Sequence, residues 1–498
     1  MSISRSAGIL LPISALPSNY GIGTLGKCAY DFVDYLKEAN QTYWQVLPVG
    51  HTSYGDSPYQ SFSSVAGNPY FVDLDILVKE GLLNKKDLAD IKVLDIQKID
   101  YGYIYETRYP ILYKAYKKGI VKYEDEFNRF VEENSKWLED YALFMACKKH
   151  FGMRAWLEWD DEDIKLRKLD AINKYKEELK DDVLFYEFIQ FLFFKQFFKL
   201  KKYANDLGIK IIGDLPIYVA LDSCEVWADS KQFQLDEETK VPKQVSGVPP
   251  DYFSEDGQLW GNPLYDWNYM KTTGYKWWID RVDGVSKCFD VIRIDHFIGF
   301  ERYWSIPANE TTAKNGHYEQ GPSIDFVSVL RDWFSNIDFI AEDLGVESDV
   351  VVKLLKDSGF PGMRVLEFGN NPDGTSYHSP HNHKENCVCY ISTHDNEPVM
   401  GWIKNTKTQD LEYAKLYFGL NSKEGYNFGF IRGGMSSVCK LFIAQFQDYL
   451  GLDDSATMNR PGTLGNWTFR FTEKQFSKKL CKKIALITHT YTRDRIDG

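Results

Sequence analysis

The sequence predicts an α/β protein with a (β/α)8 barrel, and three observations support this prediction. Short apolar segments typical of strands alternate along the chain with segments of helical periodicity. A strand followed by a helix, repeated about eight times, gives a parallel sheet with helical connections. Charged residues also follow several of these strands, as they do in barrel enzymes. Closure of the sheet gives the barrel, and an open doubly wound sheet is the alternative.

The predicted elements follow one another in a regular order. The first two strands are ILLPIS at 9–14 and YWQVLPV at 43–49, separated by the helical pattern CAYDFVDYLKEA at 28–39. Later strands are predicted in KIIGDLPIYV, VIRIDHF, FIAEDLG, MRVLEFG and CVCYISTHDN, and the last in IAQFQDYLG at 443–451. SDVVVKLLKDSGF predicts a helix with Ser348 as its N-cap and Gly359 as its stop.

Two stretches depart from this repeat within a single catalytic domain over residues 1–498. Residues 71–180 are rich in Lys, Glu and Tyr at helical spacing, which predicts a helical insertion after the second strand. Residues 222–268 are rich in turn formers, which predicts a long loop insertion after the third strand. Because a loop of this length in a compact domain is usually functional, we expect it to cover a substrate.

Composition excludes several functional classes. The net charge of −12 argues against a nucleic-acid partner, which favours a basic patch, and gives no reason to expect a membrane surface. Prolines interrupt the apolar start of the chain, and no apolar run is long enough for a membrane span. We therefore expect a cytoplasmic protein.

Cysteine usage and known binding motifs give no sign of a cofactor. The eight Cys are scattered, and the pair Cys387 and Cys389 has no second pair at zinc spacing. We expect reduced thiols, as in the cytoplasm. Neither a Walker-type phosphate loop nor an EF-hand calcium loop is present. No cofactor and no metal are expected.

Charged side chains follow four of the predicted strands. They are Asp214, Arg293 with Asp295, Glu342, and His394 with Asp395. The C-terminal ends of barrel strands form one rim, where barrel enzymes have their active sites. Residues two apart on a strand point the same way, so Arg293 is expected to hold Asp295 ionised.

Each of these residues also has a structural explanation when taken alone. A strand-end Asp or Glu is more often a helix cap or an ion-pair partner, and His394 alone would be a hydrogen-bonded core residue. Asp343, beside Glu342, is expected to point away and to cap or pair. Several carboxylates at one rim, however, suit glycosidic bond chemistry. One carboxylate attacks the anomeric carbon, and a second protonates the leaving oxygen.

The motifs VIRIDHF, AEDLG and STHDN, in this order, closely resemble those of amylomaltases, the 4-α-glucanotransferases related to the α-amylase superfamily. Further similar segments are GDLPIYVA at 213–220, GVPPDYFSEDGQLWGNPLYDW at 247–267, and MNRPGT followed by NW at 458–467. GILLPISALPS and SYGDSPYQS are also similar, so the resemblance spans nearly the whole chain.

The resemblance implies transfer of an α-1,4-glucan segment to the 4-hydroxyl of an acceptor glucan or glucose, by a retaining double displacement. It implies Asp295 as the nucleophile, Glu342 as the acid/base and Asp395 as the transition-state stabiliser. The implied substrate-binding residues are Arg293, His394, Asp214, Tyr59, Ser57, Tyr252, Phe253, Trp260 and Asn466, with Tyr54 at a secondary glucan site. The expected partners are α-1,4-glucans and maltooligosaccharides, and the expected state is a monomer or weak homodimer.

Two alternatives stay open. The first is a retaining α-glucan hydrolase on the same fold, since nothing in the spacing of the carboxylates selects transfer. The second is a non-catalytic glucan-binding protein, against which the presence of all three carboxylates argues. The chain departs from the family pattern at Ile298, where Arg is usual, and at Glu397 and Pro398. These departures concern subsite detail and leave the carboxylates in place.

Overall fold

The fold is a closed barrel of eight parallel strands. The computed structural model describes residues 3–250, 254–345 and 348–494. The barrel strands are β1 (Ser6–Leu10), β2 (Tyr43–Gln45), β3 (Lys210–Pro216), β6 (Val291–Asp295), β9 (Asp338–Ala341), β10 (Gly362–Val365), β11 (Cys387–Tyr390) and β12 (Leu441–Gln445). They close in the order β1-β12-β11-β10-β9-β6-β3-β2. The predicted (β/α)8 barrel is confirmed, and the open doubly wound alternative is wrong.

Two layers of apolar side chains explain why these segments are strands. One face of each strand fills the barrel, where Leu10, Ile212, Val291, Val388 and Ile443 belong to one buried cluster. The opposite faces pack outward against the helices in a much larger core. Strands buried on both faces read in the sequence as short continuous apolar runs.

The ends of the first and last strands differ from the prediction. The strand predicted at 9–14 is β1 at 6–10, because Pro12 has no N–H with which to extend the parallel ladder. The strand predicted at 443–451 is β12 at 441–445. The chain then turns into the helix α17 (Phe446–Leu450), which ends at Gly451 in the left-handed conformation, with φ 66°.

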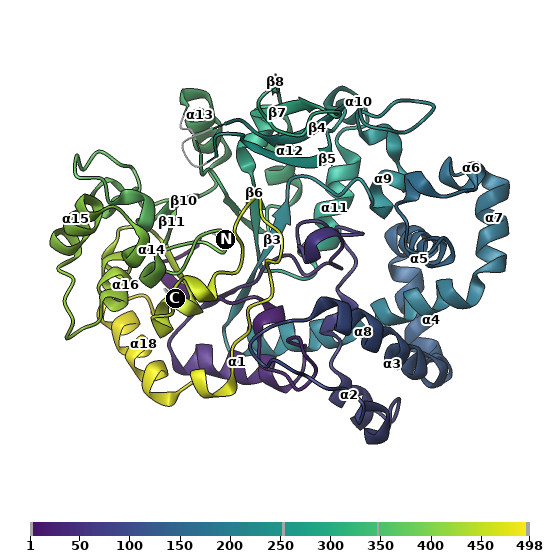
Figure 1. The fold of residues 1–498 in the computed structure, drawn as a ribbon, viewed down its shortest axis with the longest axis horizontal. Coiled ribbons are helices and arrows are strands. Elements are labelled where there is room, and N and C mark those ends of the chain that lie inside the picture. Colours follow the sequence, from purple (N-terminus) through teal and green to yellow (C-terminus); the bar gives the residue numbers. More distant parts are fainter. Residues whose placement is uncertain (1–2, 251–253, 346–347, 495–498) are drawn as a thin grey trace.

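Helices surround the barrel (Figure 1). Those that alternate with barrel strands or follow them are α1 (Lys27–Glu38), α11 (Lys276–Ser286), α12 (Ser323–Trp333), α13 (Asp349–Ser358), α14 (Val399–Asn405), α15 (Thr408–Phe418), α16 (Tyr426–Ser436) and α18 (Lys478–Thr490). Helix α13 ends as predicted at Gly359, with φ 76°. Ser348 occupies its N-cap position, but its hydroxyl makes no hydrogen bond to any described residue.

A group of helices lies between β2 and β3 and extends to one side of the barrel (Figure 1). They are α2 (Leu74–Lys79), α3 (Tyr101–Lys122), α4 (Glu124–Glu133), α5 (Ser135–His150), α6 (Glu162–Lys165), α7 (Leu169–Glu178) and α8 (Lys180–Asp206). The stretch 71–180 contains α2 to α7, and α8 continues the group of helices to Asp206. None of the helices in the described ranges combines the length and apolarity needed to cross a membrane.

The interpretation of residues 222–268 as a long loop needs correction. This stretch contains α9 (Cys224–Ala228), β4 (Gln244–Val248), β5 (Gln258–Pro263) and the start of α10 (Trp267–Thr272). β4 and β5 join β7 (Arg302–Pro307) and β8 (His317–Gln320) in an antiparallel sheet of order β5-β4-β7-β8. The sequence does not reveal this sheet because two of its four strands, β7 and β8, follow β6. They lie well downstream of β4 and β5, which are short and contain Gly and Pro.

The tight contact of β1 with its neighbours gives a first prediction. A Cβ added to Gly8 would lie 2.6 Å from the Cβ and the carbonyl oxygen of Tyr43, and 2.7 Å from Cδ1 of Ile443. We expect Gly8→Ala to destabilise the protein by about 1–3 kcal/mol through overpacking, measured by urea unfolding. Gly102→Ala in α3 is the control, because its added Cβ has only Asp100 within reach, at 3.6 Å. Equal stability of the two variants would contradict this account.

Candidate active site

A buried Arg joins two carboxylates at the C-terminal rim of the barrel. Parallel pairing sets Asp214 of β3 beside Arg293 of β6. Nη1 of Arg293 donates to both Asp214 oxygens at 2.7 Å, and to Oδ1 of Asp295 at 3.0 Å. Burial alone would lower the pKa of Arg293, but these two carboxylates outweigh it and raise that pKa well above its usual value. Burial raises the pKa of Asp295, and Arg293, which holds this carboxyl in position, opposes that shift and favours the ionised form.

Glu342 directly follows β9, and its surroundings favour the protonated acid. Burial raises the pKa of its carboxyl to about 8, and the negative charge of Asp295 acts in the same direction, whereas Arg293 opposes the shift. The backbone N–H of His296 donates to Oε2 at 2.7 Å, and that of Leu344 donates to Oε1 at 2.8 Å. His296 adopts the left-handed conformation, with φ 54°. This strained turn after β6 supports Glu342 beside Asp295.

Asp395 follows β11 and is the most open of the three carboxylates, with a side chain 39 % exposed. Nδ2 of Asn459 donates to its Oδ1 at 2.7 Å, and Nε2 of His394 lies 3.3 Å from its Oδ2. Asp395 thus has two polar neighbours that fix its orientation and still faces solvent.

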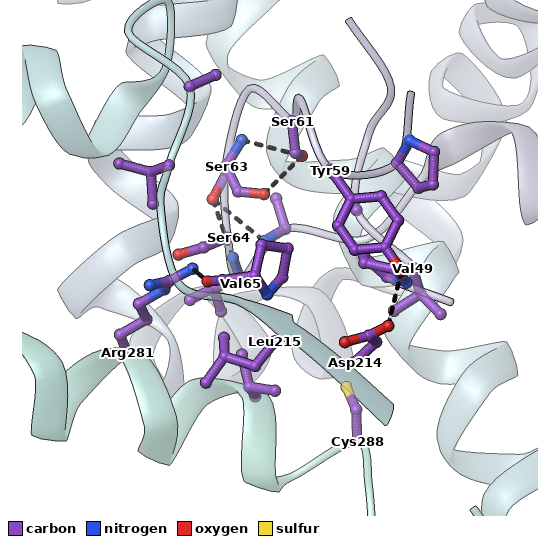
Figure 2. A pocket seen from close by; sticks show the side chains of 18 of the residues that line it. Val49, Tyr59, Ser61, Ser63, Ser64, Val65, Asp214, Leu215, Arg281 and Cys288 are labelled. Atoms are coloured by element: carbon purple, nitrogen blue, oxygen red, sulfur yellow. Dashed lines mark hydrogen bonds between the residues drawn. The ribbon is translucent and has the colours of Figure 1, made fainter. Parts of the chain in front are cut away.

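Tyr59 connects the Asp214 side of the rim to the His394 side. Its hydroxyl donates to Oδ2 of Asp214 at 2.7 Å, as Figure 2 shows, and lies 2.7 Å from Nε2 of His394. Since the single hydroxyl proton goes to Asp214, Nε2 of His394 must carry its own hydrogen. Burial lowers the pKa of His394 to about 4, so the ring is neutral at pH 7. The two rings stack with centroids 5.4 Å apart.

Two cavities adjoin this rim, and their volumes indicate that only one of them can hold a sugar. The one beneath Tyr59 in Figure 2 has a volume of about 50 Å³ and is lined by residues such as Val49, Asp214 and Cys288. It can hold only a few water molecules. The other, beside Asp395, has a volume of about 660 Å³. That volume lies within the range of roughly 300–1,000 Å³ that is typical of ligand pockets.

The larger cavity is lined by polar residues that the sequence analysis did not single out. Glu367, Asn370 and Asn459 line it together with Asp395. Oε1 of Glu367 and Oδ1 of Asn370 are buried and accept no hydrogen bond from the described residues. Unpaired buried acceptors are costly unless a ligand or water pairs with them. The MNRPGT and MRVLEFG motifs contain Asn459 and Glu367, but their spacing gave no reason to select these two residues.

The structure places the remaining site candidates as follows. Trp260 of β5 packs edge-on against His296, with ring centroids 4.8 Å apart, so the second sheet reaches the rim. The Ser57 hydroxyl accepts from the backbone N–H of Tyr59 at 3.2 Å and shapes the loop that carries Tyr59. Oδ1 of Asn466 accepts from the backbone N–H of Arg460, and its Nδ2 donates to the carbonyl oxygen of the same residue. Asn466 thereby closes the turn beside the larger cavity.

Some candidates cannot be placed, and one expectation is confirmed. Tyr252, Phe253 and the side chain of Tyr54 lie outside the described residues. Asp343 points away from Glu342, as expected, because its carboxylate accepts from the backbone N–H of Met363 at 2.6 Å and pairs with Arg364 at 3.0 Å. In the described ranges, no three His, Cys, Asp or Glu side chains are grouped as metal ligands.

A closed (β/α)8 barrel whose C-terminal rim carries one carboxyl with a pKa raised to about 8 and another paired with a buried Arg is the arrangement of an enzyme that acts on glycosidic bonds. Comparisons with known proteins identify the family. The family model described as 4-alpha-glucanotransferase matches residues 11–475. The chain belongs to this family.

Individual relatives agree along their whole length. The 4-alpha-glucanotransferase of Clostridium butyricum is 48% identical over 484 residues, covering 97% of this chain and 99% of the relative. That of Streptococcus pneumoniae is 46% identical over 496 residues, covering 98% and 97%. The amylomaltase from Streptococcus agalactiae, solved in complex with acarbose, superposes with a TM-score of 0.96 at 40% identity, covering 98% of this chain and 99% of that structure.

The buried ion pair of the rim gives a second prediction. Arg293→Met leaves Asp214 without its cation, so we expect a loss of about 3–5 kcal/mol in the free energy of unfolding. Urea unfolding at pH 7 measures this loss. The double variant Arg293→Met/Asp214→Leu should recover part of it, because no buried charge is then left unpaired. Arg331→Met on the surface of α12 is the control, expected within about 0.5 kcal/mol of the parent protein. A single variant as stable as the double would overturn this assignment.

Proposed function

We propose that this chain is a 4-α-glucanotransferase that moves a segment of an α-1,4-glucan from a donor to the 4-hydroxyl of an acceptor glucan or glucose. The observation that carries the proposal is the contrast between two neighbouring carboxyls. Glu342 is held as an acid by burial, whereas Asp295 is held against Arg293. A retaining mechanism needs one carboxyl in each state at the start of its first step.

In the first step, Asp295 attacks the anomeric carbon of the donor, and Glu342 gives its proton to the departing glycosidic oxygen. The bond between that oxygen and the anomeric carbon breaks, and the sugar is left covalently bound to Asp295. Asp395, 39 % exposed and oriented by Asn459, hydrogen-bonds to sugar hydroxyls and stabilises the transition state.

In the second step, the acceptor hydroxyl attacks the same carbon from the face that the leaving group vacated. Glu342, now ionised, takes the hydroxyl proton, and the bond to Asp295 breaks. Two inversions give net retention. Transfer predominates over hydrolysis where the acceptor site favours a sugar over water, and we assign that role to the stretch 247–263 with Trp260.

The subsite next to the cut is assigned to Arg293, His394, Asp214 and Tyr59. Asp214, Tyr59 and His394 are linked to one another by hydrogen bonds, so their geometry is set before substrate arrives. We assign further donor sugars to the 660 Å³ cavity, which is lined by Asp395, Glu367, Asn370 and Asn459.

The proposal extends to the setting of the enzyme. We propose a cytoplasmic protein, monomeric or weakly dimeric, that acts on α-1,4-glucans and maltooligosaccharides without a cofactor, a nucleic acid or a membrane. The net charge of −12 and eight free cysteines support this setting.

Maltotriose provides the direct test of activity. The parent protein should yield glucose together with maltopentaose and longer chains, with little gain in reducing ends, when products are followed by chromatography. Asp295→Asn should lose activity by on the order of 10⁴-fold or more. Asp283→Asn, which removes an exposed carboxylate on α11, should keep full activity. Glucose and maltose alone, with rising reducing ends, would instead make the protein a hydrolase.

The protonation state of Glu342 sets the alkaline limit of activity. Since the first step needs the acid form, kcat/KM should fall above about pH 8 as this group loses its proton. A glycosyl fluoride donor, whose leaving group needs no protonation, should show no such fall in its first step. An alkaline limb that is identical for both donors would rule out Glu342 as its source.

A further inference from the structure

A pair of buried thiols lies at the opposite end of the barrel from the active site. Cys387 begins β11, and Cys439 lies two residues before β12. Pairing of Val388 with Leu441 sets Cys387 beside Lys440, one residue from Cys439. This register brings the two cysteines to the same end of two adjacent strands.

The two thiols are already in contact. The proximity of the Cys439 side chain and burial together raise the pKa of the Cys387 thiol. Both side chains belong to the apolar layer between the barrel and its helices, with exposed fractions of 3% and 0%.

His383 adds a base to this pair. Its Nε2 lies 2.9 Å from the carbonyl oxygen of His378, which can only accept, so Nε2 carries the hydrogen. Nδ1 is then an acceptor, and two donors share its lone pair: the hydroxyl of Ser437 at 2.7 Å and Sγ of Cys439 at 3.3 Å. A nucleophile, a base and a group that orients the base together activate a thiol. Here these are Cys439, His383 and the carbonyl oxygen of His378.

Positive charge surrounds the sulfur that would become an anion. Arg493 donates to the carbonyl oxygens of Cys439 at 3.1 Å and Ser437 at 2.9 Å. Arg5 donates to the same Ser437 oxygen at 2.9 Å. Arg364 lies on the Cys387 side, paired with Asp343. Cationic surroundings and a His neighbour are features of reactive cysteines.

We propose that Cys439 and Cys387 form a peroxide-reactive dithiol site, in which His383 activates Cys439 and Cys387 resolves the product. The Cys439 thiol passes its proton to Nδ1 of His383, and its thiolate attacks one oxygen of hydrogen peroxide. The O–O bond breaks, and the departing hydroxide takes the proton back as water, which leaves a sulfenic acid on Cys439. The sulfur of Cys387 displaces the sulfenic oxygen as a second water. Two thiols and one peroxide thus give one disulfide and two waters.

The disulfide would link the start of β11 to the segment that precedes β12, at the N-terminal ends of the barrel strands. The active-site carboxylates lie at the other rim, so the proposal does not depend on the glucan-transfer function. Closing the chain between residues 387 and 439 restricts the unfolded state. The oxidised protein should therefore unfold at a higher temperature than the reduced one, and a dithiol reductant should reverse the shift.

The test uses the full chain in a Cys28→Ser background, because Cys28 is partly exposed whereas the other thiols are buried. The folded protein is treated with hydrogen peroxide, alkylated and digested with trypsin without reduction. We expect a linked pair of peptides, 385–404 with 433–440, and fragment ions that assign the bridge to Cys387. Cys389→Ser, which removes the neighbouring buried thiol on the same strand, should keep the link, and Cys387→Ser should lose it.

The variant His383→Gln tests whether His383 activates the Cys439 thiol or whether the two thiols react only because they are close together. We expect bridge formation to slow by at least about tenfold in this variant, because the proton acceptor is lost. Linkage through Cys389, linkage that forms only in urea, or no linkage at a peroxide excess that fully oxidises Cys28 in the parent protein would each overturn the proposal. An unchanged rate in His383→Gln would overturn the role of the base.

Discussion

The buried positive charge of Arg293 is the constraint on which the active-site rim depends. It contacts two carboxylates, and neither Asp214 nor Arg293 has appreciable access to water. A buried charge of this kind is tolerated only when it is paired and hydrogen-bonded. The parallel register of β3 and β6 provides that pairing through the backbone, because it fixes Asp214 beside Arg293. The position of Asp295, the proposed nucleophile, therefore follows from the closure of the barrel.

The same arrangement separates the roles of two carboxyls that share one low-dielectric rim. Arg293 contacts Asp295 directly, whereas Glu342 receives only neutral backbone donors from His296 and Leu344. Like charges close together cannot both ionise without cost, so the carboxyl with the weaker cation contact retains its proton. The left-handed turn at His296 contributes directly to this difference. It brings the N–H that follows Asp295 onto the proposed acid, and so couples the positions of the two groups.

The sequence predicted the barrel and the rim because both depend on local patterns. Apolar runs marked the strands, and RID, AED and THD marked their C-terminal ends. The antiparallel sheet was missed because β4 pairs with β7, more than fifty residues further along the chain, and no local alternation shows such a partner. Glu367 and Asn370 were missed for a related reason. What distinguishes them is one buried side-chain oxygen each that has no hydrogen-bond partner among the described residues, and this depends on the packing of several segments around one cavity.

The strand β11 shows how one barrel strand separates two chemistries. Its C-terminal end leads to His394 and Asp395 at the open rim, where the proposed reaction needs access to sugars. Its first residue, Cys387, lies in the closed apolar layer with Cys439 and His383. In a barrel, the rim formed by the N-terminal ends of the strands contributes to stability, and the opposite rim contributes to catalysis. A covalent change at Cys387 would therefore act on the stabilising end of β11, while the buried strand Cys387–Tyr390 keeps it apart from the carboxylates.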